Sequence, residues 1–238
     1  DHARIGRQLL RPADQLNLER LVRTFTLRTS EGFVETFGPD LIARVRVQAP
    51  GVRLRFVQKP NRDSTPLREG SVDLETGVVG KMTGPEVRAQ SLFHDRFIGV
   101  VRSGHPLSQS AITPGRYAAG RHVLVSRRGL DKGPIDEALL SVGLEREIVT
   151  VVGGFATALA LARASDLIAS VPERHTAKLR SGMHSFPLPV RTPEVTVSLL
   201  WHPRLDADPA HRWLRKCVRE VCGVDAGSSA RGRPAEEP

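Results

Sequence analysis

Apolar residues near the N-terminus first alternate as in a strand and then recur as in a helix. Phe25 and Leu27 lie in the β-branched run 24–29, which predicts a strand. After a polar break at 30–32, apolar residues recur every three or four positions and predict an amphipathic helix; they are Phe33, Val34, Phe37, Leu41, Ile42 and Val45. Gly38 and Pro39 interrupt this pattern, so either the first turn is kinked there or the main helix begins with Pro39 at its first position.

The alternation of strand and helix continues through the first third of the chain. Alternating apolar positions predict a strand over 52–57, which a loop at 59–61 ends, and a short helical turn near 66–69. A further apolar run predicts a strand over 72–76. Because strands alternating with helices are typical of a parallel sheet with crossover helices, we expect this part to form one α/β lobe.

A second α/β series begins after residue 92. The apolar run 93–102 predicts one long strand that leads into it. The following elements alternate again; they are a strand at 122–126, a helix at 134–142 ended by Gly143, a strand at 147–152, a helix at 156–164, a strand at 167–171 and a helix at 173–180. The sequence therefore predicts a second, similar lobe.

The C-terminal part is expected to return to the first lobe. Pro187, Pro189 and Pro193 mark a second crossing, which leads to a strand at 195–201 and a closing amphipathic helix at 209–222. The predicted fold is α/β, with two Rossmann-like lobes joined by two crossing strands. The expected divisions are a linker-helix remnant at 1–19, lobe I at 20–97 and 193–222, lobe II at 98–192, and a disordered tail at 223–238.

Composition narrows the class of protein. A chain of 238 residues can bury a full core in one large domain or two smaller ones. No stretch has the apolar length of a membrane helix and no signal-peptide pattern is visible, so we expect a cytoplasmic protein without a membrane partner. The net charge of +9 is spread along the chain and forms no continuous basic stripe on a helix, which points only weakly to nucleic acid. Cys217 and Cys222 are expected to be reduced core residues.

The sequence lacks the usual motifs of catalysis and cofactor binding. It contains no G-x-x-x-x-G-K-[ST] phosphate loop, no H-E-x-x-H zinc motif and no G-x-S-x-G nucleophile elbow. Gly153 and Gly154 open a helix without completing a dinucleotide motif, and the histidines are scattered. We therefore expect no enzyme activity, no cofactor and no metal ion.

Four loops that follow predicted strands carry the candidate binding residues; they lie at 29–30, 59–61, 126–129 and 153–155. In open parallel sheets ligands bind outside the C-terminal ends of the strands, so two lobes would direct these loops into one cleft. Hydroxyl groups, free N–H groups at helix starts and two arginines favour an anionic or polar small molecule, with Phe155 as an apolar wall. Ser30, taken alone, is more typical of a helix N-cap than of a ligand contact.

Seven segments resemble one known family in their order and spacing; they are LERLVRTFTLRTSEGF, LIARVRVQAPGVRLRF, LREGSVDLETGV, FIGVVRSGHPL, HVLVSRRG, VVGGFATALALARASDLIASVP and VSLLWHPRLDADPAHRWLR. The stretch 18–222 is similar to the effector-binding domain of LysR-type transcriptional regulators, which is related to type II periplasmic binding proteins. The resemblance implies a two-lobed domain that binds a small-molecule effector between its lobes and pairs with a second subunit. It places the effector at Thr29, Ser30, Pro60, Asn61, Ile98, Val100, Ser126, Arg127, Gly154 and Phe155.

In that family a winged helix-turn-helix and a linker helix precede the effector-binding domain. The first twenty residues cannot hold a winged helix-turn-helix, so we expect DNA binding only through a domain outside this chain. The expected protein is a ligand-sensing regulatory domain that forms a homodimer or higher homo-oligomer through the helix at 41–45. The alternatives are a solute-binding protein of a transport system and an enzyme on the same fold, which would need an acid or base in the cleft.

Overall fold

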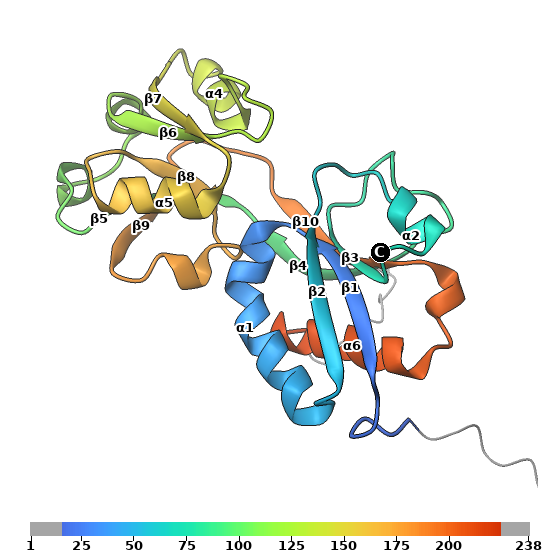
Figure 1. Ribbon diagram of the computed structural model, residues 1–238. Helices are drawn as coiled ribbons and strands as arrows, with labels where there is room; N and C mark the ends of the chain where they lie inside the picture. The colour runs from blue at the N-terminus through green and yellow to red at the C-terminus, as the bar shows by residue number, and fades with distance from the viewer. Residues whose placement is uncertain (1–15, 225–238) are drawn as a thin grey trace, which may run out of the picture.

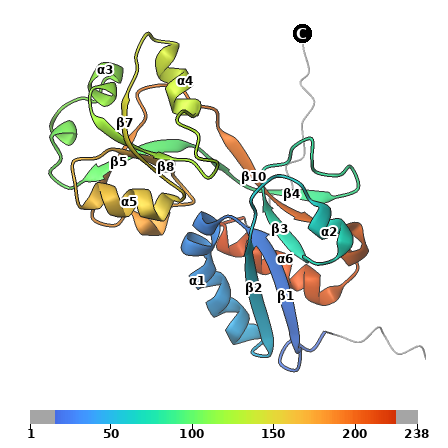
Figure 2. The same ribbon diagram turned by 45° about the horizontal axis from the view of Figure 1, so that its top comes forward.

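The computed structural model describes residues 16–224 and shows two α/β lobes joined by two chain segments (Figure 1). This arrangement confirms the predicted fold class. A second view shows that lobe I contains both β1 and α6, which lie near opposite ends of the sequence (Figure 2). The predictions for residues 1–15 and 225–238 lie outside the described residues.

Lobe I contains a five-stranded mixed sheet in the order β2-β1-β3-β10-β4. Its strands are β1 (Arg23–Thr29), β2 (Val52–Gln58), β3 (Leu74–Gly77), β4 (Arg88–Asp95) and β10 (Val195–Trp201). β1 pairs in parallel with β2 and β3, as predicted, whereas β10 is antiparallel to β3 and β4. The C-terminal ends of β1, β2 and β3 therefore meet at one edge of the sheet, where a ligand site is expected.

Two helices cover one face of the lobe I sheet. α1 (Glu31–Gln48) and α6 (Pro209–Val221) share a core with β1 and β3; its fully buried members include Phe25, Leu27, Phe33, Leu41, Leu74 and Leu214. α1 runs without a break through Pro39, so the start expected at Pro39 is wrong and the earlier start holds. The short α2 (Thr65–Glu69) packs on the other face through Leu67.

Lobe II contains two small sheets. In the first, β5 (Phe97–Arg102) is the central strand between β8 (Ala169–Pro172) and β9 (Met183–Pro187), and both pairings are antiparallel. In the second, β6 (Arg121–Val125) pairs in parallel with β7 (Glu147–Val152). One isolated bridge, between His122 and Ile168, links the two sheets.

Three short helices complete lobe II. α5 (Phe155–Arg163) packs on one apolar cluster with β5, while α3 (Pro114–Ala118) and α4 (Pro134–Leu140) contribute to another. Single 3-10 turns follow β5, at Pro106–Gln109 (η1), and β8, at Ala177–Leu179 (η2). In lobe I, a third 3-10 turn, Pro203–Leu205 (η3), lies between β10 and α6. The sequence pattern missed α3 and β9, which have five residues each and show no clear periodicity.

The long strand predicted at 93–102 is wrong, because the chain changes sheets at Arg96. β4 ends at Asp95, which is paired with Val195 of β10 in lobe I. β5 begins at Phe97, which is paired with Pro172 of β8 in lobe II. The apolar pattern is continuous across Arg96 because both halves are strands, so it cannot show that their partners differ.

The helix predicted at 173–180 is also wrong, because only the 3-10 turn η2 forms there. Asp95 accepts hydrogen bonds from the backbone amides of Arg174 (2.9 Å) and His175 (3.1 Å). Thr36 Oγ1 of α1 donates to the His175 carbonyl (2.6 Å). These bonds hold the segment after β8 against β4 and α1, and such long-range contacts are not visible in a local periodicity.

Both cysteines are unpaired and buried in the lobe I core, as predicted. Burial raises the pKa of the Cys222 thiol to about 12, so this group stays protonated at neutral pH. Among the helices of residues 16–224, none has the length and apolar composition needed to cross a bilayer.

Candidate functional site

A cleft of about 910 Å³ lies between the lobes, at the C-terminal ends of the parallel strands of lobe I. Lobe I contributes the start of α1 and the loops after β2 and β3, and lobe II contributes the loop after β6 and the start of α5. The two crossings line the cleft through Arg96, Phe97, Pro193 and Val195. The cleft is large enough for a small organic molecule.

Five of the ten predicted site residues line this cleft; they are Ser30, Pro60, Asn61, Arg127 and Phe155. Ser30 is also the N-cap of α1, since its Oγ accepts a hydrogen bond from the Phe33 amide at 3.3 Å. Ser30 can therefore cap α1 and also contact a ligand, because the residue that caps the helix lies at the cleft.

The other five predicted residues do not line the cleft. Ile98 and Val100 are 3% and 0% exposed and belong to the apolar core of lobe II, because β5 directs them inward. Thr29 is 1% exposed, and its hydroxyl donates to the Ser30 carbonyl. Ser126 Oγ accepts from the Leu130 amide at 2.8 Å, so it closes its own loop.

Gly154, the last of these, is the N-cap of α5 and faces lobe I. A Cβ atom added at Gly154 would lie 3.3 Å from the Glu31 Oε2 atom at the start of α1. The N-termini of α1 and α5 therefore approach each other across the lobes. The Glu31 carboxylate occupies the position where the positive end of α5 favours an anion.

Asp95 joins the two lobes at the base of the cleft. Besides the amides of Arg174 and His175, it accepts hydrogen bonds from the Arg96 amide (2.9 Å) and the His175 Nδ1 atom (2.6 Å). Burial raises the pKa of Asp95, but these hydrogen bonds and the charge of His175 outweigh it, and the net pKa is below its ordinary value. Asp95 is thus an ionised structural anchor whose oxygen atoms are already engaged.

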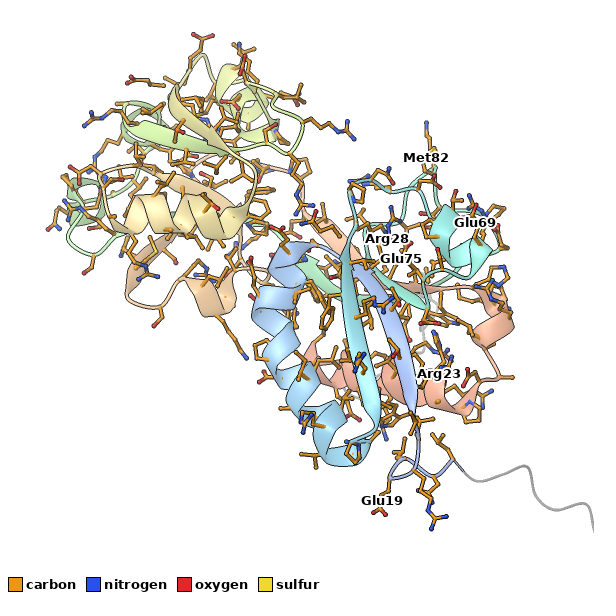
Figure 3. The ribbon with its side chains drawn as sticks, in the orientation of Figure 1. Glu19, Arg23, Arg28, Glu69, Glu75 and Met82 are labelled. Atoms are coloured by element: carbon orange, nitrogen blue, oxygen red, sulfur yellow. The ribbon has the colours of Figure 1, made fainter. Side chains whose placement is uncertain are left out.

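A buried group of charges lies under the lobe I side of the cleft. Glu75 of β3 is 0% exposed and accepts hydrogen bonds from Arg28 (3.0 Å), Lys59 (2.8 Å) and Ser64 (3.1 Å). Figure 3 shows the Arg28 and Glu75 side chains next to each other within the sheet of lobe I. We call Arg28, Lys59 and Glu75 the floor triad; of its three members, Lys59 lines the cleft.

The cleft has more available positive charge than negative charge. Arg62, Arg127 and Arg128 line it and have no hydrogen-bond or ion-pair partner among residues 16–224. Its carboxylates are engaged, Asp95 as described and Asp63 by the amide and hydroxyl of Thr65, which hold the pKa of Asp63 below its ordinary value. An anion entering the cleft would therefore find unpaired cations from both lobes.

Aromatic and aliphatic side chains form the apolar part of the cleft. Phe97 and Phe155 lie edge to face with ring centroids 6.1 Å apart. Val78, Met82 and Val195 add to this surface. A ligand with an apolar body and an acidic group matches this lining.

A second hollow of about 510 Å³ lies beside the segment that follows β8. Its arginines are already bonded: Arg96 to Glu173 (2.7 Å), Arg174 to the Cys222 carbonyl (2.9 Å) and Arg180 to the Glu173 carbonyl (2.9 Å). Its polar groups thus serve the junction of the lobes, and the interlobe cleft is the better ligand site. Within residues 16–224, no group of three His, Cys, Asp or Glu side chains is placed to hold a metal ion.

Sequence reasoning missed Phe97 and the three residues of the floor triad, including Lys59. Lys59 lies in the predicted loop 59–61, from which the resemblance places only Pro60 and Asn61 at the effector. Arg28 and Glu75 could have been noticed in the sequence, since each is a charged residue next to a leucine within a predicted strand. Such residues are rarely buried unless they are paired, so their presence in two neighbouring strands indicates an ion pair.

The comparisons with known proteins agree with this geometry. The family model for the LysR substrate binding domain matches residues 19–223. The transcriptional activator NahR of Pseudomonas putida is 31% identical over 207 residues, which cover 84% of this chain and 67% of NahR. A probable transcriptional regulator from Pseudomonas aeruginosa is 28% identical with a TM-score of 0.72, over 84% of this chain and 68% of that one.

A solved structure of lower identity shares the fold alone. The BenM effector-binding domain with its effector benzoate has a TM-score of 0.62 at 17% identity, and the match covers 89% of this chain and 98% of that one. The two lobes, the two crossings and the interlobe cleft are thus those of a type II periplasmic binding protein-like fold. The chain belongs to the LysR substrate-binding-domain family and is the effector-sensing regulatory domain of a LysR-type transcriptional regulator.

Proposed function

We propose that this domain binds a small organic anion with an apolar body in the interlobe cleft, and that occupancy of the cleft controls transcription. The observation that carries the proposal is the charge of the cleft, where Arg127 and Arg128 have no partner among residues 16–224 while Asp63 and Asp95 are engaged. The Phe97 and Phe155 rings would contact the apolar body of the effector. In the whole protein, control would act in the cytoplasm through a DNA-binding domain.

A thermal-shift screen of carboxylates tests the binding step, because a ligand selective for the folded state raises the unfolding temperature. Benzoate, the effector of the BenM domain, phenylacetate and succinate form a first panel, each with its neutral amide. The carboxylates are expected to stabilise the protein more than the amides do. Equal effects of acids and amides would contradict an anionic effector.

Substitutions in the cleft then locate the bound carboxylate. Ser30→Ala and Phe155→Ala are each expected to weaken its binding several-fold. The first removes a hydrogen bond, which costs about 0.5–1.5 kcal/mol, and the second removes an apolar contact with the body of the effector. Thr113→Ala is the matched control, because Thr113 caps α3 by accepting from the Arg116 amide (3.2 Å) and does not line the cleft. If both cleft variants fold and bind as the wild type does, the site lies elsewhere.

We also infer that the domain pairs with a second copy through α1. On this helix Val47 is 85% exposed and Ile42 is 43% exposed, while Arg44 is held by Glu220 and Gln48 by Trp213 within the chain. A two-fold pairing places the same helix of each copy at the interface, where these exposed side chains would be covered. Light scattering at tens of micromolar is expected to give the mass of a dimer, and a strictly monomeric mass would contradict this pairing.

A further inference from the structure

The floor triad combines two positive charges with one negative charge. Glu75 is shared by Arg28 and Lys59, so one cation of the triad remains uncompensated by any carboxylate within it. Arg28 donates in addition to the Asp63 carbonyl (2.6 Å) and the Asn61 Oδ1 atom (3.2 Å). Arg28 therefore uses its guanidinium to hold the loop after β2 in place, and it is Lys59 that remains available.

Lys59 has donor capacity that the protein does not use. An ammonium group has three N–H donors, and among residues 16–224 the Lys59 Nζ atom donates only to Glu75. Its side chain is 7% exposed, yet the residue lines the cleft. Burial lowers the pKa of Lys59, although the hydrogen bond to Glu75 opposes this change. A second anion at the ammonium would offset the burial of its charge.

Gly77 keeps space for this ammonium group at the end of β3. A Cβ atom added at Gly77 would lie 2.9 Å from the Lys59 Nζ atom, which is too close for two unbonded atoms. The backbone of Gly77 does not adopt a left-handed conformation, so it is this close approach that favours glycine here. Gly77 itself also lines the cleft.

We propose that Lys59 binds the acidic group of the effector from the floor of the cleft and makes the site select an acid over its neutral amide. The inference rests on the proposed function and adds the residue that sets the charge requirement. The ammonium is already held by Glu75, and the loop that carries it is held by Arg28, so little ordering is needed when the anion binds. Arg127 and Arg128 are exposed, and no described residue holds their side chains in this way.

Calorimetric titration of the acid and amide pairs measures this selectivity. The quantity compared is the ratio of the amide Kd to the carboxylate Kd, with benzoate and benzamide as the first pair. Lys59→Met is expected to lower the ratio roughly ten- to a hundredfold, the range of a charge-assisted hydrogen bond. Lys59→Arg should retain most of it. Lys178→Met is the matched control, since Lys178 pairs with Asp40 on the surface, outside the cleft.

Gly77→Ala is a variant that retains the Lys59 ammonium group but changes its position. Its methyl group would displace the Lys59 ammonium, so the acid-to-amide selectivity should fall while the far-UV circular dichroism spectrum stays that of the wild type. If Lys59→Met and Gly77→Ala fold and retain the ratio while Ser30→Ala and Phe155→Ala weaken binding, the role of Lys59 is overturned and the proposed function stands. If no carboxylate of the panel binds the wild type, both are overturned.

Discussion

The two lobes differ in how their strands are joined into sheets and in how their apolar residues are buried. In lobe I one continuous five-stranded sheet and two helices, α1 and α6, bury one large core, and a small cluster lies on the other face under α2. In lobe II two small sheets are linked by one isolated bridge, and two smaller clusters replace the single core. The difference indicates that lobe I resists local unfolding better than lobe II, because more of its backbone belongs to one hydrogen-bonded sheet.

Each lobe also contains a buried ion cluster, but only one of them lies at the cleft. In lobe I the floor triad holds the loop that carries Lys59 and Asn61. In lobe II Arg146 makes a two-point contact with Asp136, at 2.7 and 3.1 Å, near Tyr117 and His122. None of these four lobe II residues lines the cleft. The same chemistry therefore positions a ligand site in one lobe and supports the fold in the other.

Removing the shared carboxylate of lobe I should have the largest effect. Glu75→Ala leaves Arg28 and Lys59 buried without a counter-charge, which is expected to lower the free energy of unfolding by roughly 3–5 kcal/mol. Urea denaturation followed by circular dichroism measures the change. Asp136→Ala should also destabilise the protein, because it strands the Arg146 guanidinium.

Glu75→Ala and Asp136→Ala together show whether a buried ion cluster positions the ligand site or only stabilises the fold. Where enough folded protein remains, Glu75→Ala should also weaken carboxylate binding, whereas Asp136→Ala should leave the affinity of the cleft near that of the wild type. Asp40→Ala, which breaks the exposed pair with Lys178, is the control and should cost less than about 1 kcal/mol. Equal losses of affinity in the Glu75 and Asp136 variants would remove the distinction between the lobes.

A change of pH is expected to have a smaller effect on the free energy of unfolding, through His122 of lobe II. His122 is 0% exposed, its Nε2 atom bonds the Tyr117 carbonyl (2.7 Å), and its Nδ1 atom has no partner among the described residues. Burial, reinforced by the charge of Arg146, lowers the pKa of His122 to about 4, from about 6.5 in the unfolded chain. Between these values the unfolded chain binds a proton that the folded chain does not.

The contribution of His122 to stability is therefore complete above pH 6.5 and is lost as the pH falls toward 4. The loss amounts to about 3 kcal/mol over this window. His122→Phe cannot titrate, so its stability should fall less between pH 6.5 and 4, as measured by urea denaturation at each pH. His211 of lobe I, whose pKa burial also lowers, is present in both proteins and does not affect the difference. The same pH slope in both would mean that His122 is not buried in its neutral form.

The sequence by itself determined the order of the elements and the two-lobed plan. Hydrophobic periodicity acts over neighbouring residues, so β1, β7, β10 and α6 could be located from it within a residue or two. It also placed the loops after β1, β2 and β6 and the start of α5 at the candidate site, because parallel strands bring these ends together.

Only the tertiary structure decided which side chains of those loops reach the cleft. Ile98 and Val100 are apolar members of a strand, and their burial follows from the sheet that β5 joins in lobe II. The turns after β8 are bonded to Asp95 and Thr36, which lie far from them in the sequence. The floor triad likewise joins β1, β3 and the loop after β2, so its three charges lie side by side only once these segments pack together.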